Sequence, residues 1–177
     1  MSTALNATYY RDPVRGYAKY IDVEAAIDHH LLNVLAFNVD ALRLSCYMHI
    51  PRGGKLTFGP IWDFDRALGS TDGRDNNPKT WRSTSADRGT DFFNYPWWNR
   101  MFRDIDFFQK YIDRFQSLRK AQFSEDNINA IIDRMAGELF EAQKRNLSRW
   151  NQRPRSQYGG TYEGEIRYMQ TWLGDRI

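Results

Sequence analysis

The chain has 177 residues, of which 41% are hydrophobic and 15% aromatic, so it is long enough to bury a core as one domain. Its net charge of +3, from 25 basic and 22 acidic residues, is too small to predict binding to nucleic acid. A single cysteine excludes an intramolecular disulfide and a zinc site of paired thiolates. No apolar run reaches the roughly 18 residues that cross a bilayer, and residues 1–10 lack the basic and apolar regions of a signal peptide.

The first predicted helix covers residues 23–38. Apolar side chains recur there at helical spacing, and Asp22 stands where an N-cap is expected. Residues 1–21, by contrast, contain Pro13 and Gly16, and we expect them to be irregular.

A β-hairpin is expected after this helix. Apolar and polar residues alternate over Leu42–Ile50, and an apolar set recurs over Lys55–Trp62. The loop between the two runs includes Gly53 and Gly54, which favours a tight connection. Cys46 belongs to the apolar set of the first strand, so we expect it to be buried and unreactive.

A long irregular stretch over residues 69–95 separates the hairpin from further helices. It is rich in small and polar residues, and such a length without periodicity indicates either a functional loop or a solvated insertion. Helices are expected over residues 97–103, 107–119 (capped by Asp106), 125–150 (capped by Ser124) and 162–177. The residues expected to face inward in the longest helix are Ile128, Ile131, Ile132, Met135, Leu139, Phe140 and Leu147. This order predicts an α+β fold, mainly α, in a single domain spanning residues 1–177.

Acidic residues flank the predicted hairpin on both sides. Asp40 precedes its first strand, and Asp63 and Asp65 end its second. Because antiparallel strands bring these two ends to one edge, we expect Asp40 and Asp63 to be neighbours. Converging carboxylates disfavour one another's ionisation, and a divalent cation bound through oxygen, such as Mg²⁺ or Mn²⁺, relieves that repulsion. Spacing alone leaves open a second interpretation, in which these aspartates only form turns and caps.

Several segments resemble the CotH family of atypical protein kinases, which are similar to spore coat protein H. The first is Asn38-Val39-Asp40-Ala41-Leu42-Arg43-Leu44-Ser45, and the second runs from Lys55 to Gly69 and includes Trp62-Asp63-Phe64-Asp65. Pro96-Trp97-Trp98-Asn99-Arg100-Met101, with Asp106-Phe107 after it, and the ending from Glu165 to Arg176 also resemble that family. The resemblance extends from about Tyr20 to the C-terminus, and Trp-Asp-Phe-Asp is its most specific part.

The resemblance implies a kinase-like C-lobe, in which the hairpin carries the metal site, followed by a C-terminal helical bundle. It implies phosphoryl transfer from ATP to serine in proteins with Mg²⁺ (or Mn²⁺). Asp40 matches the family's catalytic aspartate, Asp63 matches its metal-binding aspartate, and Asp65 and Ser45 are further candidate ligands. Ser45 stands where the common kinase catalytic loop has a metal-binding Asn, so a second metal is in question.

The resemblance also implies a place and partners for the protein. The family is secreted and acts at the spore coat or cell surface, so the expected substrate is a coat or cell-surface protein. Kinases of this family use an N-terminal lobe with a phosphate-binding Lys, whereas here Lys19 alone precedes Lys55. We therefore expect the sequence to be a fragment that lacks that lobe.

Two other functions stay open from sequence. One is a metal-dependent sugar-nucleotide transferase that uses Asp63-x-Asp65. The other is a non-catalytic carbohydrate-binding module in which Trp81, Trp97 and Trp98 stack on sugars, although at least one Trp of the adjacent pair is expected in the core. His30 fits the apolar face of its helix and is expected to be a core histidine rather than a ligand.

Overall fold

Helices dominate the structure, and one two-stranded antiparallel sheet accompanies them, which confirms the predicted α+β, mainly α class. The computed structural model describes residues 1–70, 73–80 and 92–177. The chain divides into two compact units, Met1–Ser117 and Leu118–Ile177; the single-domain organisation stays a prediction. Within the described ranges, none of the helices is both long and apolar enough to pass through a membrane.

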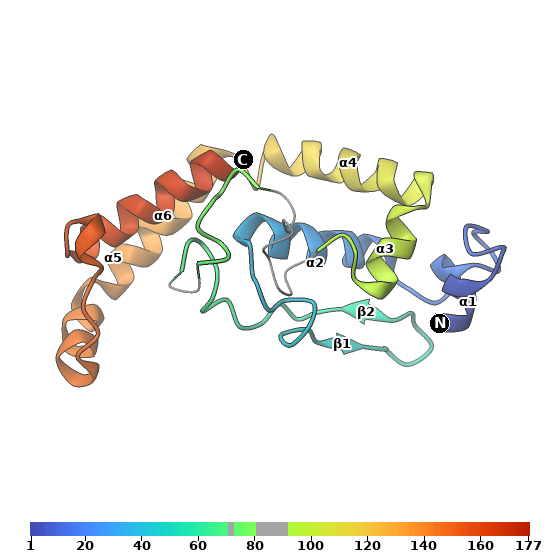
Figure 1. Cartoon of the computed structure of the whole chain (residues 1–177), viewed down its shortest axis with the longest axis horizontal. Coiled ribbons are helices and arrows are strands. Elements are labelled where there is room, and N and C mark those ends of the chain that lie inside the picture. Colours follow the sequence, from blue (N-terminus) through green and yellow to red (C-terminus); the bar gives the residue numbers. More distant parts are fainter. Residues whose placement is uncertain (71–72, 81–91) are drawn as a thin grey trace. The chain divides into compact units, whose positions relative to one another are not determined.

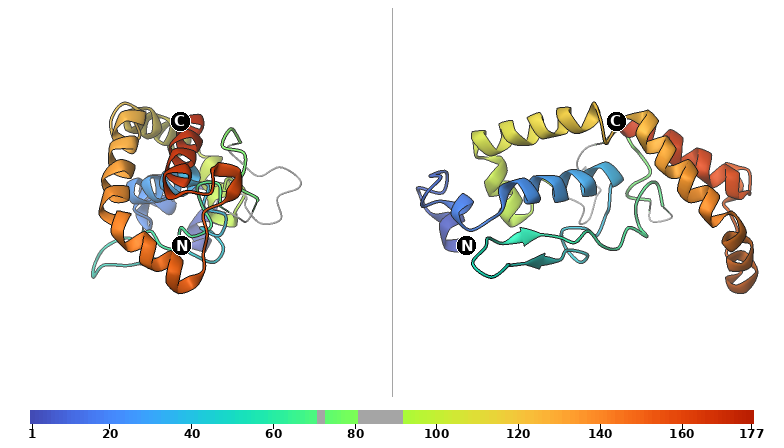
Figure 2. Two further views of the ribbon diagram at one scale, coloured as in Figure 1. Left: turned by 90° about the vertical axis from the view of Figure 1, so that its left-hand side faces the viewer. Right: turned by 180° about the vertical axis from the view of Figure 1, so that it is seen from behind.

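The elements follow in the order in which Figure 1 labels them. In chain order they are α1 (Ser2–Asn6), the 3-10 turn η1 (Tyr17–Lys19), α2 (Val23–Ala36), β1 (Met48–His49), β2 (Thr57–Phe58), α3 (Pro96–Phe102), α4 (Ile105–Arg119), α5 (Glu125–Trp150), η2 (Ser156–Tyr158) and α6 (Tyr162–Arg176). Helix α2 runs through the first unit with the hairpin on one side and α4 on the other (Figures 1 and 2). Residues 1–21 are less irregular than predicted, because they contain α1 and η1, and Ile21 forms a parallel bridge to Leu56.

Helix α2 begins at the predicted N-cap and ends earlier than predicted. The Asp22 carboxylate accepts the Ala25 N–H at 3.1 Å, which satisfies one amide of the first turn. At the other end Phe37 takes a left-handed conformation (φ 50°), and the amide of Asn38 bonds the Asn33 carbonyl at 2.9 Å. This left-handed closure stops the helix at Ala36 and turns the chain toward Asp40.

The hairpin is much shorter than the predicted strands over 42–50 and 55–62. Only Met48↔Phe58 and His49↔Thr57 pair. The first strand is lost upstream because the Asp40 carbonyl accepts the amides of Arg43, Leu44 and Ser45, at 3.2, 2.9 and 3.0 Å. Residues 40–45 are therefore a compact turn, which we call the Asp40 turn, because amides already bonded to one carbonyl cannot join a ladder.

The core of the first unit surrounds His30, which is fully buried. Its Nε2 lies 2.8 Å from the Phe92 carbonyl oxygen, and its Nδ1 lies 2.8 Å from the Tyr111 hydroxyl. Because a carbonyl only accepts, Nε2 donates to Phe92, and in a neutral imidazole Nδ1 then accepts from the hydroxyl. Burial lowers the pKa of His30 to about 3. The rings that contact it are Phe92, Phe93, Trp98, Phe102 and Tyr111, at centroid distances of 4.4 to 6.2 Å. The prediction of a core histidine is confirmed.

Helix α4 starts at Ile105 rather than at the predicted 107. Its cap is Asp104 and not Asp106, since the Asp104 carboxylate accepts the Asp106 amide at 3.2 Å and its carbonyl accepts the Phe108 amide at 2.9 Å. The other oxygen of the buried Asp104 carboxylate accepts the Tyr17 hydroxyl at 2.8 Å. The cap position was misassigned because this tertiary partner is distant in sequence.

The second unit is an antiparallel pair of helices, α5 and α6 (Figure 2). Ser124 caps α5 as predicted, accepting the Asn127 amide at 3.4 Å. The predicted inward face of α5 is wrong in part. Ile128 and Ile132 are buried, whereas Ile131, Met135, Leu139 and Phe140 are exposed. The predicted helix is confirmed, but within this unit α6 covers only part of its apolar stripe.

Candidate functional site

The candidate site is built on the segment that leaves α2, and Asn38 holds it together. The Asn38 side chain is fully buried. Its Nδ2 donates to the Asn33 Oδ1 at 3.3 Å and to the Asp63 carbonyl at 3.1 Å, while its Oδ1 accepts the Asp40 amide at 3.4 Å. One amide side chain thus joins the end of α2 to both candidate aspartates.

Ser45 makes the second connection between the two aspartates. Its amide bonds the Asp40 carbonyl at 3.0 Å, and its hydroxyl donates to Asp63 Oδ2 at 3.1 Å. The Asp40 turn therefore ends on a hydroxyl that orients the Asp63 carboxylate. Asp40 and Asp63 are neighbours as expected, but Asn38 and Ser45, rather than a long hairpin ladder, bring them together.

The segment from Asp63 to Leu68 runs beside the end of α2. The Leu68 amide bonds the Ala36 carbonyl at 2.9 Å, and the Val39 amide lies 3.5 Å from the Arg66 carbonyl. Asp63 has φ 63° and Leu68 has φ 61°, a left-handed conformation that costs non-glycine residues roughly 1–3 kcal/mol. The strain at Asp63 is offset by the Asn38 and Ser45 contacts, which fix its backbone and carboxylate.

Arginine side chains surround the Asp40 carboxylate, whose side chain is 13% exposed. Arg43 lies 3.2 Å from Oδ1, Arg66 3.5 Å from Oδ2, and Arg74 3.5 Å from Oδ1. Arg43 and Arg66 are exposed themselves. The site thus combines one acid inside a basic cluster with a second acid, Asp63, that is open to solvent.

A divalent cation fits this arrangement only with ligands from outside the chain. Among the described residues, no three His, Cys, Asp or Glu side chains lie close enough to hold a metal together. The exposed Asp63 carboxylate and the Ser45 hydroxyl are adjacent oxygen donors, which suits Mg²⁺, a cation that takes its other ligands from water and phosphate. Asp65 is exposed and has no hydrogen-bond or ion-pair partner within the described chain.

Comparison with models of protein families identifies the family of this chain. A family model described as CotH kinase protein matches residues 1–177, the whole chain. The chain belongs to the CotH kinase family. This confirms the resemblance carried by residues 38–45 and 55–69. Comparison with curated proteins and with solved structures finds no match.

Family membership gives the kinase class, and the geometry adds residues that the sequence reasoning missed. Asn38, Arg66 and Arg74 all contact Asp40 or Asp63. Asn38 and Arg66 lie within the segments that resemble the family, and this position in the sequence could have marked them as site residues. Arg74 belongs to the long irregular stretch, where no periodicity indicates what a side chain faces.

The rival interpretations gain nothing from the structure. Among the described residues Asp63 and Asp65 belong to no cluster of three or more metal-binding side chains, so a centre built on Asp63-x-Asp65 would also need ligands from outside the chain. Trp98 is buried against His30 and Phe58, so it is a core residue, as expected for one of the pair. Trp81 lies outside the described residues.

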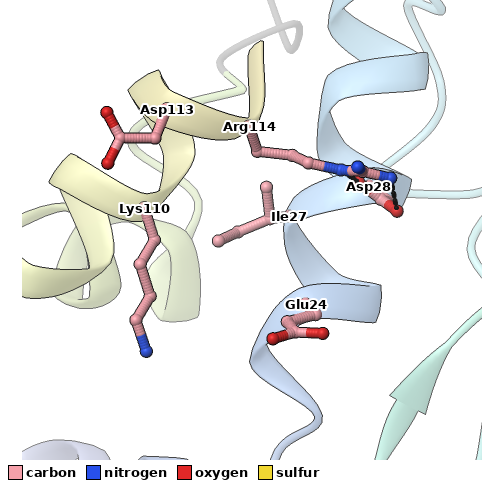
Figure 3. Close-up of a pocket in the computed structure, with 6 residues that line it drawn as sticks. All are labelled: Glu24, Ile27, Asp28, Lys110, Asp113 and Arg114. Carbon is pink, nitrogen blue, oxygen red and sulfur yellow. Dashed lines mark hydrogen bonds and ion pairs between the residues drawn. The ribbon is translucent and has the colours of Figure 1, made fainter. Parts of the chain in front are cut away.

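A cavity of about 440 Å³, separate from the candidate site, lies between α2 and α4 and contains none of the predicted site residues (Figure 3). Arg114 of α4 bonds both oxygens of Asp28 on α2, at 2.7 and 2.8 Å. The side chain of Ile27 forms an apolar part of the wall. This paired arrangement joins the two helices, and we assign it a structural role.

Proposed function

We propose that this chain is the phosphoryl-transfer part of a CotH-type protein kinase, a kinase-like C-lobe that transfers a phosphoryl group from ATP to a serine or threonine hydroxyl. The supporting observation is that Asn38 and Ser45 tie Asp40 and Asp63 into one polar site. Family membership supports the kinase class. The two aspartates then take the two roles that phosphoryl transfer requires, one at the attacking hydroxyl and one at the metal.

Asp63 is the proposed metal ligand, with Ser45 and Asp65 as the neighbouring oxygen donors. The Ser45 hydroxyl orients Asp63 Oδ2, so the carboxylate needs little rearrangement to bind a cation. When bound, Mg²⁺ or Mn²⁺ neutralises phosphate charge and aligns the terminal phosphoryl group. Asp63 contributes the fixed ligand in this arrangement, and ATP and water supply the remainder.

Asp40 is the proposed catalytic residue. Its carboxylate accepts a hydrogen bond from the substrate hydroxyl and orients the oxygen for in-line attack on the terminal phosphorus. The new bond joins that oxygen to phosphorus, the bond from phosphorus to the bridging oxygen of ADP breaks, and the hydroxyl proton passes to Asp40 and then to water. Arg43 and Arg66, exposed beside Asp40, present guanidinium groups to the transferred phosphoryl oxygens.

The expected partners and location are part of the same proposal. The substrate is a coat or cell-surface protein, and the protein acts after secretion. The net charge of +3 gives no reason to include nucleic acid among its ligands.

The test is phosphate incorporation from labelled ATP into a serine-containing protein, with Mg²⁺ and then Mn²⁺, by the full chain. Asp63→Ala is expected to lower the rate by roughly 100-fold or more, because a charge-stabilising group at the phosphates is lost. Asp106→Ala is the matched control, since Asp106 is an exposed acid at the start of α4. Equal rates for Asp63→Ala and the control would refute the assignment.

A further inference from the structure

An apolar groove of about 360 Å³ opens beside the Asp40 turn. One wall is the segment from Leu42 to Met48, and the other is the start of α3, from Tyr95 to Trp98. Phe58 of β2 also lines it, is buried, and holds its ring edge-on to Trp97 at 6.5 Å. We call this the Trp97 groove. Its base belongs to the packed core, so its shape is supported from below.

The Trp97 groove is continuous with the candidate active site. Arg43 lines the groove and also pairs with Asp40 at 3.2 Å. Burial raises the pKa of the Tyr95 phenol, and the charges of Arg43 and Asp40 act on that phenol in opposite directions, so Tyr95 is within electrostatic reach of both. An extended peptide advances about 3.3–3.6 Å per residue. A peptide with its hydroxyl at Asp40 therefore places a neighbouring side chain at the groove.

The lining of the groove selects the chemistry of that side chain. Leu42, Cys46, Met48 and Trp97 present apolar surface, and Arg43 is the one charged residue among the described residues that line it. An apolar side chain gains free energy by leaving water here, whereas a basic side chain meets a like charge at Arg43. The volume is at the low end of ligand sites, which span roughly 300–1,000 Å³, and it suits one or two side chains.

We propose that the Trp97 groove binds an apolar side chain of the protein substrate next to the acceptor serine or threonine, and that Arg43 excludes basic residues from that position. The proposal rests on the proposed function, because that function places the acceptor hydroxyl at Asp40. It adds the substrate class, which is a serine or threonine segment with an adjacent aliphatic or aromatic residue.

The only cysteine of the chain provides a direct probe of this groove. Cys46 lines it and is partly exposed, so the expected burial in a strand is wrong, because β1 begins only at Met48; partial burial still raises the pKa of its thiol. Its reaction with a disulfide-exchange reagent at alkaline pH is therefore slow but measurable, and an occupant of the groove slows it further. Cys46→Ser confirms the origin of the signal, because that variant has no thiol.

The ligands are alanine-based peptides with one serine and one leucine. The leucine stands directly before the serine in one peptide and directly after it in the other. At least one leucine register is expected to protect Cys46 at about tenfold lower peptide concentration than the all-alanine parent, the difference that burying one leucine gives. The same peptide with lysine in place of leucine is expected to protect no better than the parent. Equal protection by the leucine, lysine and parent peptides would overturn the proposal.

Two matched variants locate the effect in the groove. Met48→Lys adds a positive charge to its lining, and Ile50→Lys adds the same charge to the same hairpin outside it; the side chains replaced are 43% and 67% exposed. Met48→Lys is expected to abolish protection by the leucine peptide, and Ile50→Lys to leave it unchanged. Equal protection of the two variants contradicts the proposal.

An Asp63→Asn protein separates this proposal from the proposed function. Protection of Cys46 in that protein is expected to match the wild type, because it needs no phosphoryl transfer. Protection without phosphate incorporation in the wild type would support the groove and refute the kinase assignment. Phosphorylation of leucine and lysine peptides at equal rates, without protection, would refute the groove and support the kinase.

Discussion

Helix α2 contributes to two very different regions. The side of the helix around His30 belongs to a closed aromatic core, whereas the turn beyond its C-terminal end, at Asp40, forms an open charged site. Around His30 the polar atoms are buried and paired, and five rings lie within 6.2 Å. Around Asp40 and Asp63 the groups are ionic, partly exposed and joined through strained backbone. The first region therefore supplies rigidity, and the second uses it to position charge. Changes in the core should unfold the protein, whereas changes in the site should remove function with little loss of stability.

The largest loss of stability is expected for Trp98→Ala. Trp98 is buried, and its ring lies 4.4 Å from His30 and 5.1 Å from Phe58. Its truncation should lower the free energy of unfolding by about 3–5 kcal/mol, measured by urea denaturation. Trp97→Ala is the neighbouring control and should cost clearly less, because Trp97 is only partly buried. A loss for Trp98→Ala no larger than that for Trp97→Ala would contradict the assignment of Trp98, rather than Trp97, to the core.

Asn38→Ala tests the point where core and site meet. It removes three hydrogen bonds and leaves buried polar groups without a partner, at a cost of about 1–3 kcal/mol. It should also weaken metal-dependent nucleotide binding, because Asp63 loses its backbone anchor. Ser45→Ala removes only the hydroxyl contact to Asp63 and should cost less stability. A loss no greater than that of Ser45→Ala would contradict the account of Asn38.

The pH dependence of stability probes the core alone. Burial lowers the pKa of His29 to about 4 and that of His30 to about 3, from an ordinary value of 6.5. Below pH 6.5 the unfolded chain binds protons that the folded chain does not, so stability is complete above that pH and falls as the pH falls. Between pH 6.5 and about 5 the slope approaches ~1.4 kcal/mol per pH unit for each histidine.

Chemical denaturation at several pH values measures that slope, and His29→Leu should reduce it by about half. The interval above about pH 5 is chosen because carboxylates remain ionised there. A free energy of unfolding that is constant over the interval would mean that neither histidine is kept neutral by the fold.

The smallest effect is expected at the cavity between α2 and α4. Arg114→Ala removes the paired contact to Asp28, but both side chains are more than a third exposed, at 45% and 41%. Exposed ion pairs contribute about 0.2–1 kcal/mol, and salt screens them. The loss should therefore shrink at high salt. A loss comparable to that of Trp98→Ala would show that this contact stabilises the protein far more than an exposed ion pair does.

Sequence patterns predicted the regular elements well, since local rules determine them. Asp22 and Ser124 cap α2 and α5 as expected because a cap depends on residues three positions apart. The strand over 42–50 was wrong because alternation describes side chains, whereas the Asp40 carbonyl decided where the backbone amides of residues 43–45 bond. The stripe of Met135 and Leu139 was wrongly placed inward because periodicity gives a face but not its neighbour.

The sequence predicted the two acidic residues of the candidate site but not the residues that surround them. Asp40 and Asp63 stood out because they flank a hairpin and match a family motif. Their contacts to Asn38 and Arg74 are tertiary, and no local pattern reports them. For the same reason the sequence suggested a cluster of carboxylates, whereas the structure has one acid among arginines and one open to solvent.

Calorimetric titration of wild type, Asp63→Asn and Asp40→Asn with an Mg²⁺ complex of a non-hydrolysable ATP analogue tests the central claim most directly. The division of roles predicts that Asp63→Asn loses the metal-dependent part of binding, because the charge of the proposed ligand is removed. Asp40→Asn should bind the complex at least as well as the wild type while failing to phosphorylate, since Asp40 acts on the hydroxyl. Metal-dependent binding by Asp63→Asn equal to that of the wild type would contradict the account.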